Sequence, residues 1–268
     1  MTTPAPAERM AEETIPHTRI MKCTLEVEPS RAYWAECGLI GAPVSHDHAF
    51  QRAIFGSKTY LRVERLIADL RHRYDAFPPA LEVLSRWHGM RPDDRALICH
   101  WHTQLADPLY RRFTGELLVD RYYHGPRPNV DSELLVNWLE NQVPGRWQYV
   151  TRRKIASKMM SSAFTAGLLA SSRDPRDIRF PQVSDEALTY LLYLLREVDF
   201  AGTLLANPYV ASVGLDSDSI GRRLRAIPAI GLRRQADLID FQWQHDNLRH
   251  WAESTGLLST VNTRRGVG

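Results

Sequence analysis

Apolar residues recur at helical spacing over most of this chain. In residues 57–75, Leu66, Ile67 and Leu70 fall on one side of a helix. Ser57 is placed to cap the first turn of that helix. Comparable patterns predict further helices over residues 29–42 (ended by Gly38), 80–87, 91–124 (two helices broken near Asp107-Pro108), 131–141, 151–166, 185–198 and 216–227.

Proline and glycine mark the boundaries between these segments. Residues 125–128 (GPRP) form the clearest linker in the chain. Residues 171–180 (SSRDPRDIRF) have the composition of a β-hairpin that turns at Asp174-Pro175, and residues 236–243 are expected to form a strand. We therefore predict a mainly α fold, a helical bundle with winged helix-turn-helix-like subdomains and short β-hairpins.

The same boundaries divide the chain into four stretches. We expect residues 1–45 to be a flexible leader with a short helix and residues 46–125 to be an N-terminal helical domain. Residues 126–198 are predicted to be a winged-helix-like domain, and residues 199–268 a C-terminal helix-turn-strand domain with a flexible tail.

Composition narrows the class of protein. The chain has 268 residues, of which 44% are hydrophobic, so it can bury a sizeable core. No apolar run approaches the roughly 20 residues that span a bilayer, and the first residues lack the pattern of a secretory signal. The three cysteines have neither a zinc nor a disulfide spacing, so a reducing cytoplasm is the expected location.

The helix predicted over residues 151–166 is divided into an apolar and a basic side. Lys154, Ser157, Lys158 and Ser161 fall opposite the apolar side in a helical projection, and no carboxylate occurs between residues 146 and 172. Thr151 is placed to cap this helix and Gly167 to end it. A small, basic helix face fits the major groove of DNA, whereas a merely solvated basic face is the alternative interpretation.

Two further groups of arginines extend the basic character. Arg173, Arg176 and Arg179 would project from the predicted hairpin as a wing, although neighbouring aspartates dilute their charge. A second cluster comprises Arg222, Arg223, Arg225, Arg233 and Arg234. The residues predicted to contact DNA are Thr151, Arg152, Arg153, Lys154, Ser157, Lys158, Ser161, Arg173, Arg176, Arg222, Arg223 and Arg225.

Other candidate chemistry has little support in the sequence. His46 with His48, and His100 with His102, are paired without the further ligands that a metal site needs. The chain has no phosphate-binding glycine loop and no nucleophile elbow. We therefore predict no catalytic residue, no metal, no cofactor and no small-molecule substrate.

The order of segments resembles that of the BrxA family of bacteriophage-exclusion (BREX) defence systems. The resemblance covers roughly residues 95–250 and rests on RALICHWHTQLADPLYRRFTGELLVDRYYHG, VNWLENQVPGRW, TRRKIASKMMSSAFTAGLL and VSDEALTYLLYLL. It implies a small helical protein with winged-helix-like parts that binds double-stranded DNA beside larger defence enzymes. Arg152, Arg153, Lys154 and Lys158 lie in the segment that carries this implication.

Three functional hypotheses follow. The first is a non-enzymatic component of an anti-phage system that binds double-stranded DNA. The second is an adaptor whose winged-helix surfaces hold a protein partner, such as a methyltransferase or ATPase of the same system; the net charge of only +3 keeps it open. The third, a metal-dependent nuclease, has the weakest support, because the aspartates at 93, 94, 216 and 218 are better explained as residues of helix N-termini.

Overall fold

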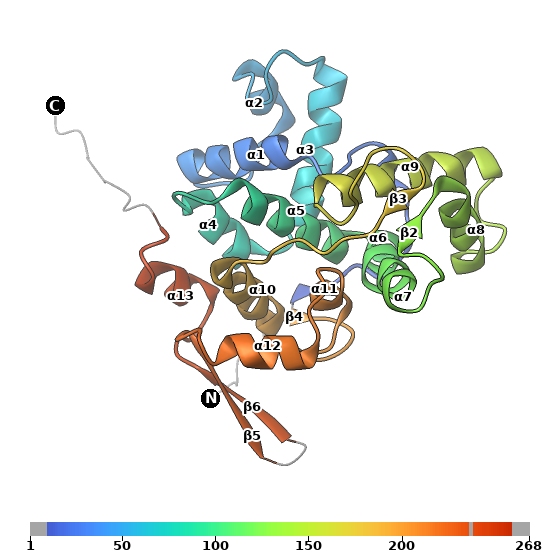
Figure 1. Ribbon diagram of the computed structural model, residues 1–268. Coiled ribbons are helices and arrows are strands. Elements are labelled where there is room, and N and C mark those ends of the chain that lie inside the picture. The colour runs from blue at the N-terminus through green and yellow to red at the C-terminus, as the bar shows by residue number, and fades with distance from the viewer. Residues whose placement is uncertain (1–9, 236–237, 259–268) are drawn as a thin grey trace, which may run out of the picture.

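The computed structural model describes residues 10–235 and 238–258 (Figure 1). The helices are η1 (Arg19–Met21), α1 (Val27–Ile40), α2 (His46–Gln51), α3 (Tyr60–Tyr74), α4 (Pro78–Arg86), α5 (Pro92–Ala106), α6 (Pro108–Arg112), η2 (Phe113–Leu117), α7 (Leu118–Tyr123), α8 (Ser132–Gln142), α9 (Tyr149–Thr165), α10 (Asp185–Glu197), α11 (Pro208–Ala211), α12 (Ser217–Leu224) and α13 (Leu248–Ser254). The strands are β1 (Met10–Ala11), β2 (Asn129–Val130), β3 (Arg176–Asp177), β4 (Val198–Asp199), β5 (Ile230–Gln235) and β6 (Leu238–Trp243). The predicted mainly helical fold with short hairpins is confirmed.

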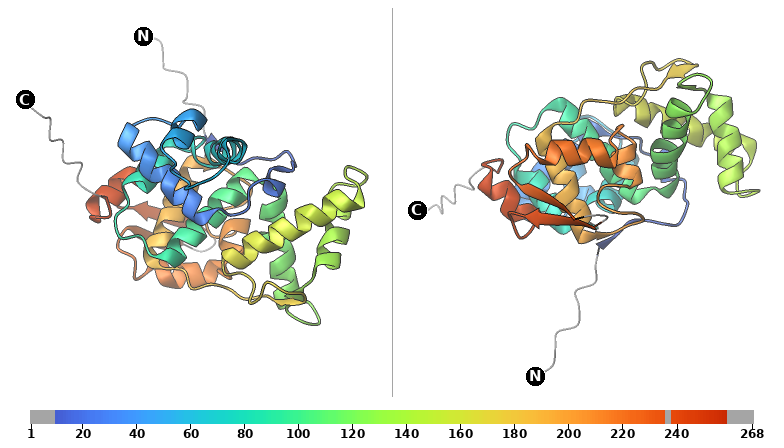
Figure 2. Two further views of the ribbon diagram at one scale, coloured as in Figure 1. Left: turned by 90° about the horizontal axis from the view of Figure 1, so that it is seen from above. Right: turned by 60° about the horizontal axis from the view of Figure 1, so that its bottom comes forward.

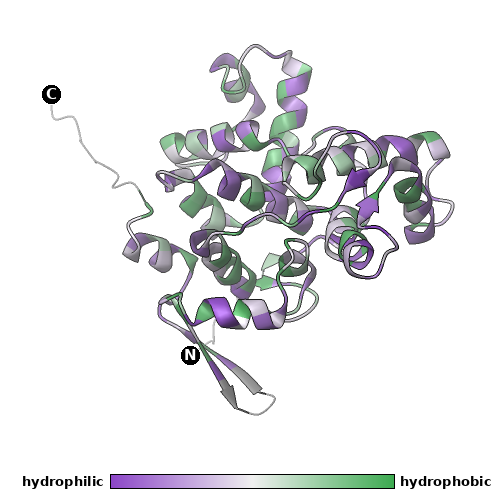
Figure 3. Ribbon diagram, in the orientation of Figure 1, coloured by the Kyte–Doolittle hydropathy of each residue, from purple (hydrophilic) through white to green (hydrophobic). Residues whose placement is uncertain are grey.

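Helices α5 and α10 form the centre of the molecule. Every residue from Leu97 to Ala106 and from Ala187 to Leu195 is buried, so other elements surround both helices. Green, hydrophobic residues dominate α10 in Figure 3 for this reason. One connected cluster of buried apolar side chains extends from Ile20 to Ala252. The division into four stretches stays a prediction.

Caps explain where several helices begin. The side chain of Asp107 accepts hydrogen bonds of 3.0 Å from the amides of Leu109 and Tyr110, and Pro108 follows it at the first helical position. The predicted break between α5 and α6 is therefore confirmed. Asp131 caps α8 in the same way, with its side chain accepting a hydrogen bond of 2.8 Å from the Leu134 amide.

Four helix ends differ from the prediction. Gly38 lies inside α1, which ends instead at Gly41, where the backbone is left-handed (φ 66°). Thr59 rather than Ser57 caps α3. Thr151 does not cap α9, because Gln148 occupies the N-cap position. The Thr151 amide already donates to the Gln148 carbonyl over 2.9 Å, so Thr151 lies within the first turn. The fourth difference is α12, which stops at Leu224 rather than near residue 227.

Residues 118–179 have the element order of a winged helix: α7, β2, α8, α9 and a hairpin. Strand β3 pairs antiparallel with β2, and a bridge between Leu169 and Ile178 closes the hairpin. The predicted two-stranded hairpin of residues 171–180 therefore starts earlier, near Leu168, and gains a third strand. In both views of Figure 2, α8 and α9 (yellow-green) form a lobe at one end of the molecule.

Residues 185–243 repeat that order with α10, β4, α11, α12 and the β5–β6 hairpin. Here β4 pairs in parallel with β1 rather than with the hairpin. The hairpin extends away from the helices (Figure 1). Residues 230–235 form its first strand, which the sequence pattern does not predict. Residues 236 and 237 of the predicted strand 236–243 lie outside the described residues.

The start of the described chain packs along the helical body. The Glu13 amide donates to the Leu105 carbonyl over 2.8 Å, and His17 Nε2 lies 2.8 Å from the Ala106 carbonyl oxygen. Residues 10–21 thus make specific contacts where the sequence predicts a flexible leader. The reason is that the carbonyls of Leu105 and Ala106, at the end of α5, are available as hydrogen-bond acceptors for this segment. Residues 1–9 and the predicted tail at 259–268 lie outside the described residues.

In the part of the chain that the structure describes, none of the helices combines the length and the apolar character that crossing a bilayer requires.

Candidate nucleic-acid interface

Helix α9 presents one side to the protein and one to solvent. Its inner side, which includes Ile155, Ala156 and Met159, is buried against the core, with α8 packed beside it. The outer side carries exposed side chains at the five positions Arg153, Lys154, Ser157, Lys158 and Ser161. The helical projection of the sequence places four of these residues correctly, since packing buries the opposite, apolar side.

Among the described residues, no carboxylate forms an ion pair with Arg153, Lys154 or Lys158. The sequence of α9 and its flanks contains no acidic residue, and the structure brings none across from α8 to these three cations. The outer side of α9 therefore keeps a positive potential that an anionic partner is able to use.

Arg152 belongs to a different environment. Its side chain is 16% exposed and forms an ion pair with Glu140 of α8. Its Nη1 also donates to the Trp147 carbonyl over 2.6 Å. Arg152 lies about 160° around the helix from Lys154. The helical projection that places Lys154 on the outer side therefore places Arg152 on the inner side. The Arg152 side chain therefore connects α9 to α8 through its ion pair with Glu140.

The wing contains one exposed and one paired arginine from the predicted set. Arg173 is exposed. Arg176 is only 11% exposed, and its Nε donates to Asp174 over 2.8 Å. Asp174 also accepts a hydrogen bond of 2.9 Å from the Ser132 amide, which fixes the wing to the start of α8. Thus one wing aspartate, Asp174, pairs with one wing arginine, Arg176.

The second basic cluster is divided in the same manner. Arg222 on α12 and Arg225 directly after it are exposed, and so is Arg233 on β5. Arg223 forms an ion pair with Asp185 at the start of α10. The side chain of Arg234 lies outside the described residues. This surface lies on a separate part of the molecule from α9 (Figure 1).

Sequence reasoning missed two apolar residues on the outer side of α9. Val150 is 62% exposed and Phe164 is 39% exposed. A helical projection that includes every residue of α9 places both within about 80° of Lys154. They were overlooked because the basic residues dominate the segment, and they make this surface suitable for apolar as well as ionic contacts.

The paired histidines have structural partners. His100 lies between the hydroxyls of Tyr110 (3.0 Å) and Ser212 (2.9 Å), and burial lowers its pKa to about 3. His48 contacts the Glu36 carboxylate over 2.6 Å. Within the described ranges, no three His, Cys, Asp or Glu side chains gather so as to hold a metal ion.

Comparison with known proteins gives a likeness to solved structures. No family model matches the chain, and no curated protein matches it. Among solved structures, it is similar to an uncharacterized protein from Magnetospirillum magneticum with a TM-score of 0.52 and 19% sequence identity. The superposition covers 68% of this chain and 97% of that one. At this identity the likeness concerns the fold alone.

Proposed function

We propose that this protein binds double-stranded DNA without catalysing a reaction, and that the outer side of α9 enters the major groove. The observation that carries the proposal is the set of three unpaired cations and two serines on the solvent side of α9, within a winged-helix arrangement. Short serine side chains let the helix backbone approach the bases, while Arg153, Lys154 and Lys158 reach phosphates.

Two neighbouring surfaces extend the proposed footprint. Arg173 on the wing contacts the backbone beside the groove, and Arg222 and Arg225 contact a more distant part of the duplex. Arg152, Arg176 and Arg223 contribute less, because each already neutralises a carboxylate of the protein. Phosphate contacts of this kind give affinity without sequence preference.

The cellular role that we propose is that of a cytoplasmic component of a BREX-type anti-phage system. The support is the resemblance of the segments around α5 to α10 to the BrxA family. Deleting the gene from a host that carries such a system should then abolish protection against phage. Complementation with the Lys154→Ala/Lys158→Ala variant should fail to restore it, and full protection by that variant would argue against a role for DNA binding.

The DNA-binding test is a fluorescence-anisotropy titration of the full chain against an arbitrary duplex of about 30 base pairs at several salt concentrations. Lys154→Ala/Lys158→Ala should weaken binding and reduce the log–log salt slope by about 2, since each phosphate contact contributes about 0.9. The control is Lys58→Ala/Arg65→Ala, which removes the same charge from exposed positions outside α9. An unchanged affinity and slope in the first variant would show that α9 is not the interface.

One observation favours the adaptor as a second candidate. Val150 and Phe164 flank the basic residues on the same side of α9 and are exposed. A protein partner with an acidic, partly apolar surface would cover both kinds of side chain. Val150→Ser/Phe164→Ser should then reduce co-purification with the products of neighbouring genes while leaving duplex binding unchanged. Equal loss of DNA binding would assign the two apolar residues to the DNA interface instead.

A further inference from the structure

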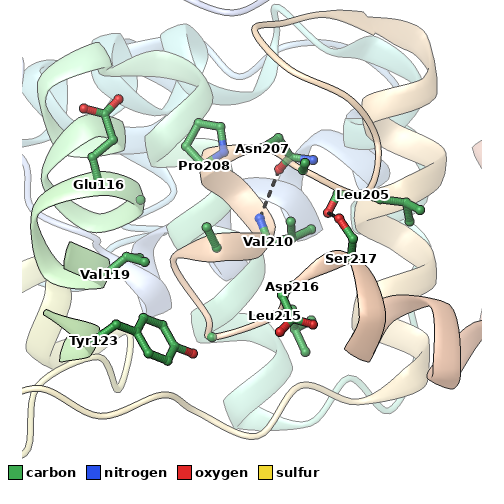
Figure 4. A pocket seen from close by; sticks show the side chains of 14 residues that line it. Glu116, Val119, Tyr123, Leu205, Asn207, Pro208, Val210, Leu215, Asp216 and Ser217 are labelled. Carbon is green, nitrogen blue, oxygen red and sulfur yellow. Dashed lines mark hydrogen bonds between the residues drawn. The ribbon is translucent and has the colours of Figure 1, made fainter. Parts of the chain in front are cut away.

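A cavity of about 440 Å³ lies between the segment from Gly115 to Tyr123 and the segment from Leu205 to Ser217, away from the outer side of α9. Helices η2 and α7 form one wall, and α11 with the start of α12 forms the other (Figure 4). Val119, Leu205, Val210 and Leu215 make the surface mainly apolar. Its volume lies within the range of pockets that hold small organic ligands.

Two close contacts of glycine backbone fix the walls of this cavity relative to each other. Gly115 lies in the π-helical turn η2, where a Cβ atom would come within 2.5 Å of Pro208 Cβ. Gly214, with a left-handed backbone (φ 75°), lies so close to the Phe180 ring that any side chain would overlap it. The walls therefore meet through glycine backbone at two points and are formed in advance of any ligand. Single π-helical turns are frequent at functional sites.

The aromatic wall of the cavity is Tyr123. Its side chain is 58% exposed, and its ring stacks on Phe180 with a centroid distance of 6.0 Å and an interplanar angle of 28°. Figure 4 shows the Tyr123 hydroxyl directed from α7 toward Leu215 and Asp216. An aromatic ring and a carboxylate therefore lie at the same end of the cavity, on opposite walls.

Asp216 is the acidic group at that end of the cavity. Its carboxylate accepts a hydrogen bond of 2.7 Å from the Ser219 amide, which holds its pKa below the usual value and keeps it ionised. Glu116 stands at the opposite edge with its carboxylate turned outward (Figure 4). The residues that the structure places around this cavity include no lysine, arginine or histidine.

The other polar side chains are already engaged. The Asn207 side-chain oxygen accepts hydrogen bonds from the amides of Tyr209 and Val210, and the Ser217 hydroxyl donates to the Leu205 carbonyl. The charged acceptor at this end of the cavity is the Asp216 carboxylate, which also receives the Ser219 amide and lies in the field of Arg222. An ammonium group satisfies both this carboxylate and the Tyr123 ring, through a charge-assisted hydrogen bond and a cation–π contact.

We propose that this cavity binds a small organic cation, an amine that carries an apolar body. The ammonium group contacts Asp216 and the face of Tyr123, while the apolar body lies against Val119, Val210 and Leu215. This site shares no residue with α9, so it is separate from the surface that we propose enters the major groove. Asp216 does cap α12, the helix that carries Arg222 of the wider footprint.

The test is isothermal titration calorimetry of the full chain with three probes of one shape: 2-phenylethylamine, the neutral 2-phenylethanol and the anionic phenylacetate. The amine should bind at least tenfold more tightly than the alcohol, and phenylacetate should not bind. Asp216→Asn should lower amine affinity about tenfold and leave the alcohol unchanged. Asparagine also caps helices well, so this variant retains the start of α12.

Two further variants complete the test. Asp218→Asn removes the same charge from the first turn of α12 but outside the cavity, so it should leave amine affinity unchanged. Val119→Trp fills the cavity and should abolish binding of amine and alcohol alike. Equal affinity for the amine and the alcohol, an unchanged Asp216→Asn variant, or no binding of any probe would each overturn the proposal.

Discussion

Arginines in this protein differ in their role, and the difference depends on whether a carboxylate of the protein pairs with them. Arg152 and Arg153 are adjacent, yet Arg152 turns inward to Glu140 whereas Arg153 is exposed. The same division separates Arg223, which pairs with Asp185, from Arg222. An arginine with a carboxylate partner has less charge to offer DNA, so the exposed arginines and lysines are the ones expected to matter for binding.

Arg152 should therefore matter more for stability than for DNA. Arg152→Ala removes an ion pair with the partly exposed Glu140 and leaves the Trp147 carbonyl without its donor, so we expect the free energy of unfolding to fall by about 1 to 2 kcal/mol. Lys158→Ala, at an exposed position of the same helix, should change it by less than about 0.5 kcal/mol. Urea denaturation followed by circular dichroism measures both. Equal stabilities would mean that the Arg152 contacts contribute nothing.

The buried histidines should make stability depend on pH. Burial lowers the pKa of His100 to about 3 and that of His102 to about 4, from an ordinary value of 6.5. Below pH 6.5 His100 and His102 bind protons in the unfolded chain, whereas both rings stay neutral in the folded chain until the pH approaches about 4. The free energy of unfolding should therefore fall as pH decreases, by up to about 1.4 kcal/mol per pH unit for each histidine.

Urea titrations between about pH 7.5 and pH 5 test this dependence. His100→Gln should reduce the slope of unfolding free energy against pH by up to about 1.4 kcal/mol per pH unit, the effect of one bound proton. His88→Gln, at an exposed position, should leave the slope unchanged. A wild-type stability that stays flat over this range would contradict the assignment of neutral, buried histidines.

At the scale of elements, the ends of α9 set which residues reach solvent. The helix begins at Tyr149, two residues before Thr151, and the Tyr149 hydroxyl donates to Glu133 of α8 over 2.9 Å. At its other end, Gly167 adopts a left-handed backbone (φ 82°) and leads into the hairpin. The start of α9 depends on α8, which lies outside the segment, whereas its end depends on a local glycine, so only the end was predicted correctly.

Gly167→Ala should therefore destabilise the winged-helix unit. Alanine is strained in a left-handed conformation, so we expect a loss of about 1 kcal/mol in the free energy of unfolding. Thr151→Ala should cost little, because Thr151 does not cap the helix. Thermal unfolding of the two variants distinguishes a cap at Gly167 from a cap at Thr151, and the reverse order of stability would restore the original prediction.

Across the whole molecule, the first described residues connect distant elements. Glu12 forms an ion pair with Arg111 of α6, with both side chains under 10% exposed, and accepts a hydrogen bond from Tyr209 of α11. Strand β1 adds a parallel pair with β4. Residues 10–12 thus lie against elements that are about a hundred and about two hundred residues later in the sequence.

Glu12→Ala should weaken the entire molecule rather than one end of it. Removing one partner leaves the buried Arg111 guanidinium without its carboxylate, which costs about 3 kcal/mol. We expect one unfolding transition at a lower urea concentration, with tryptophan fluorescence and circular dichroism coincident. The control Glu64→Ala changes an exposed glutamate. Unfolding of the variant in two separate steps would show that the N-terminal segment unfolds on its own.

The sequence by itself determined the features that depend on local spacing. Periodic apolar residues located most helices, Asp107-Pro108 located a break, and Gly167 located the end of α9, because each of these acts within a few residues of itself. The exposure of Lys154, Ser157, Lys158 and Ser161 follows from helical geometry alone. Whether these residues bind DNA is a question that binding experiments answer.

Only the tertiary structure decided which polar groups find partners. The pairing of Arg152, Arg176 and Arg223 with carboxylates depends on how elements pack, as do the contacts of Glu12. The cavity beside Tyr123 and Asp216 likewise exists only where residues 115–123 meet residues 205–217. Spacing along the chain carries no record of such contacts, because they join residues whose separation in sequence is unrelated to their distance in space.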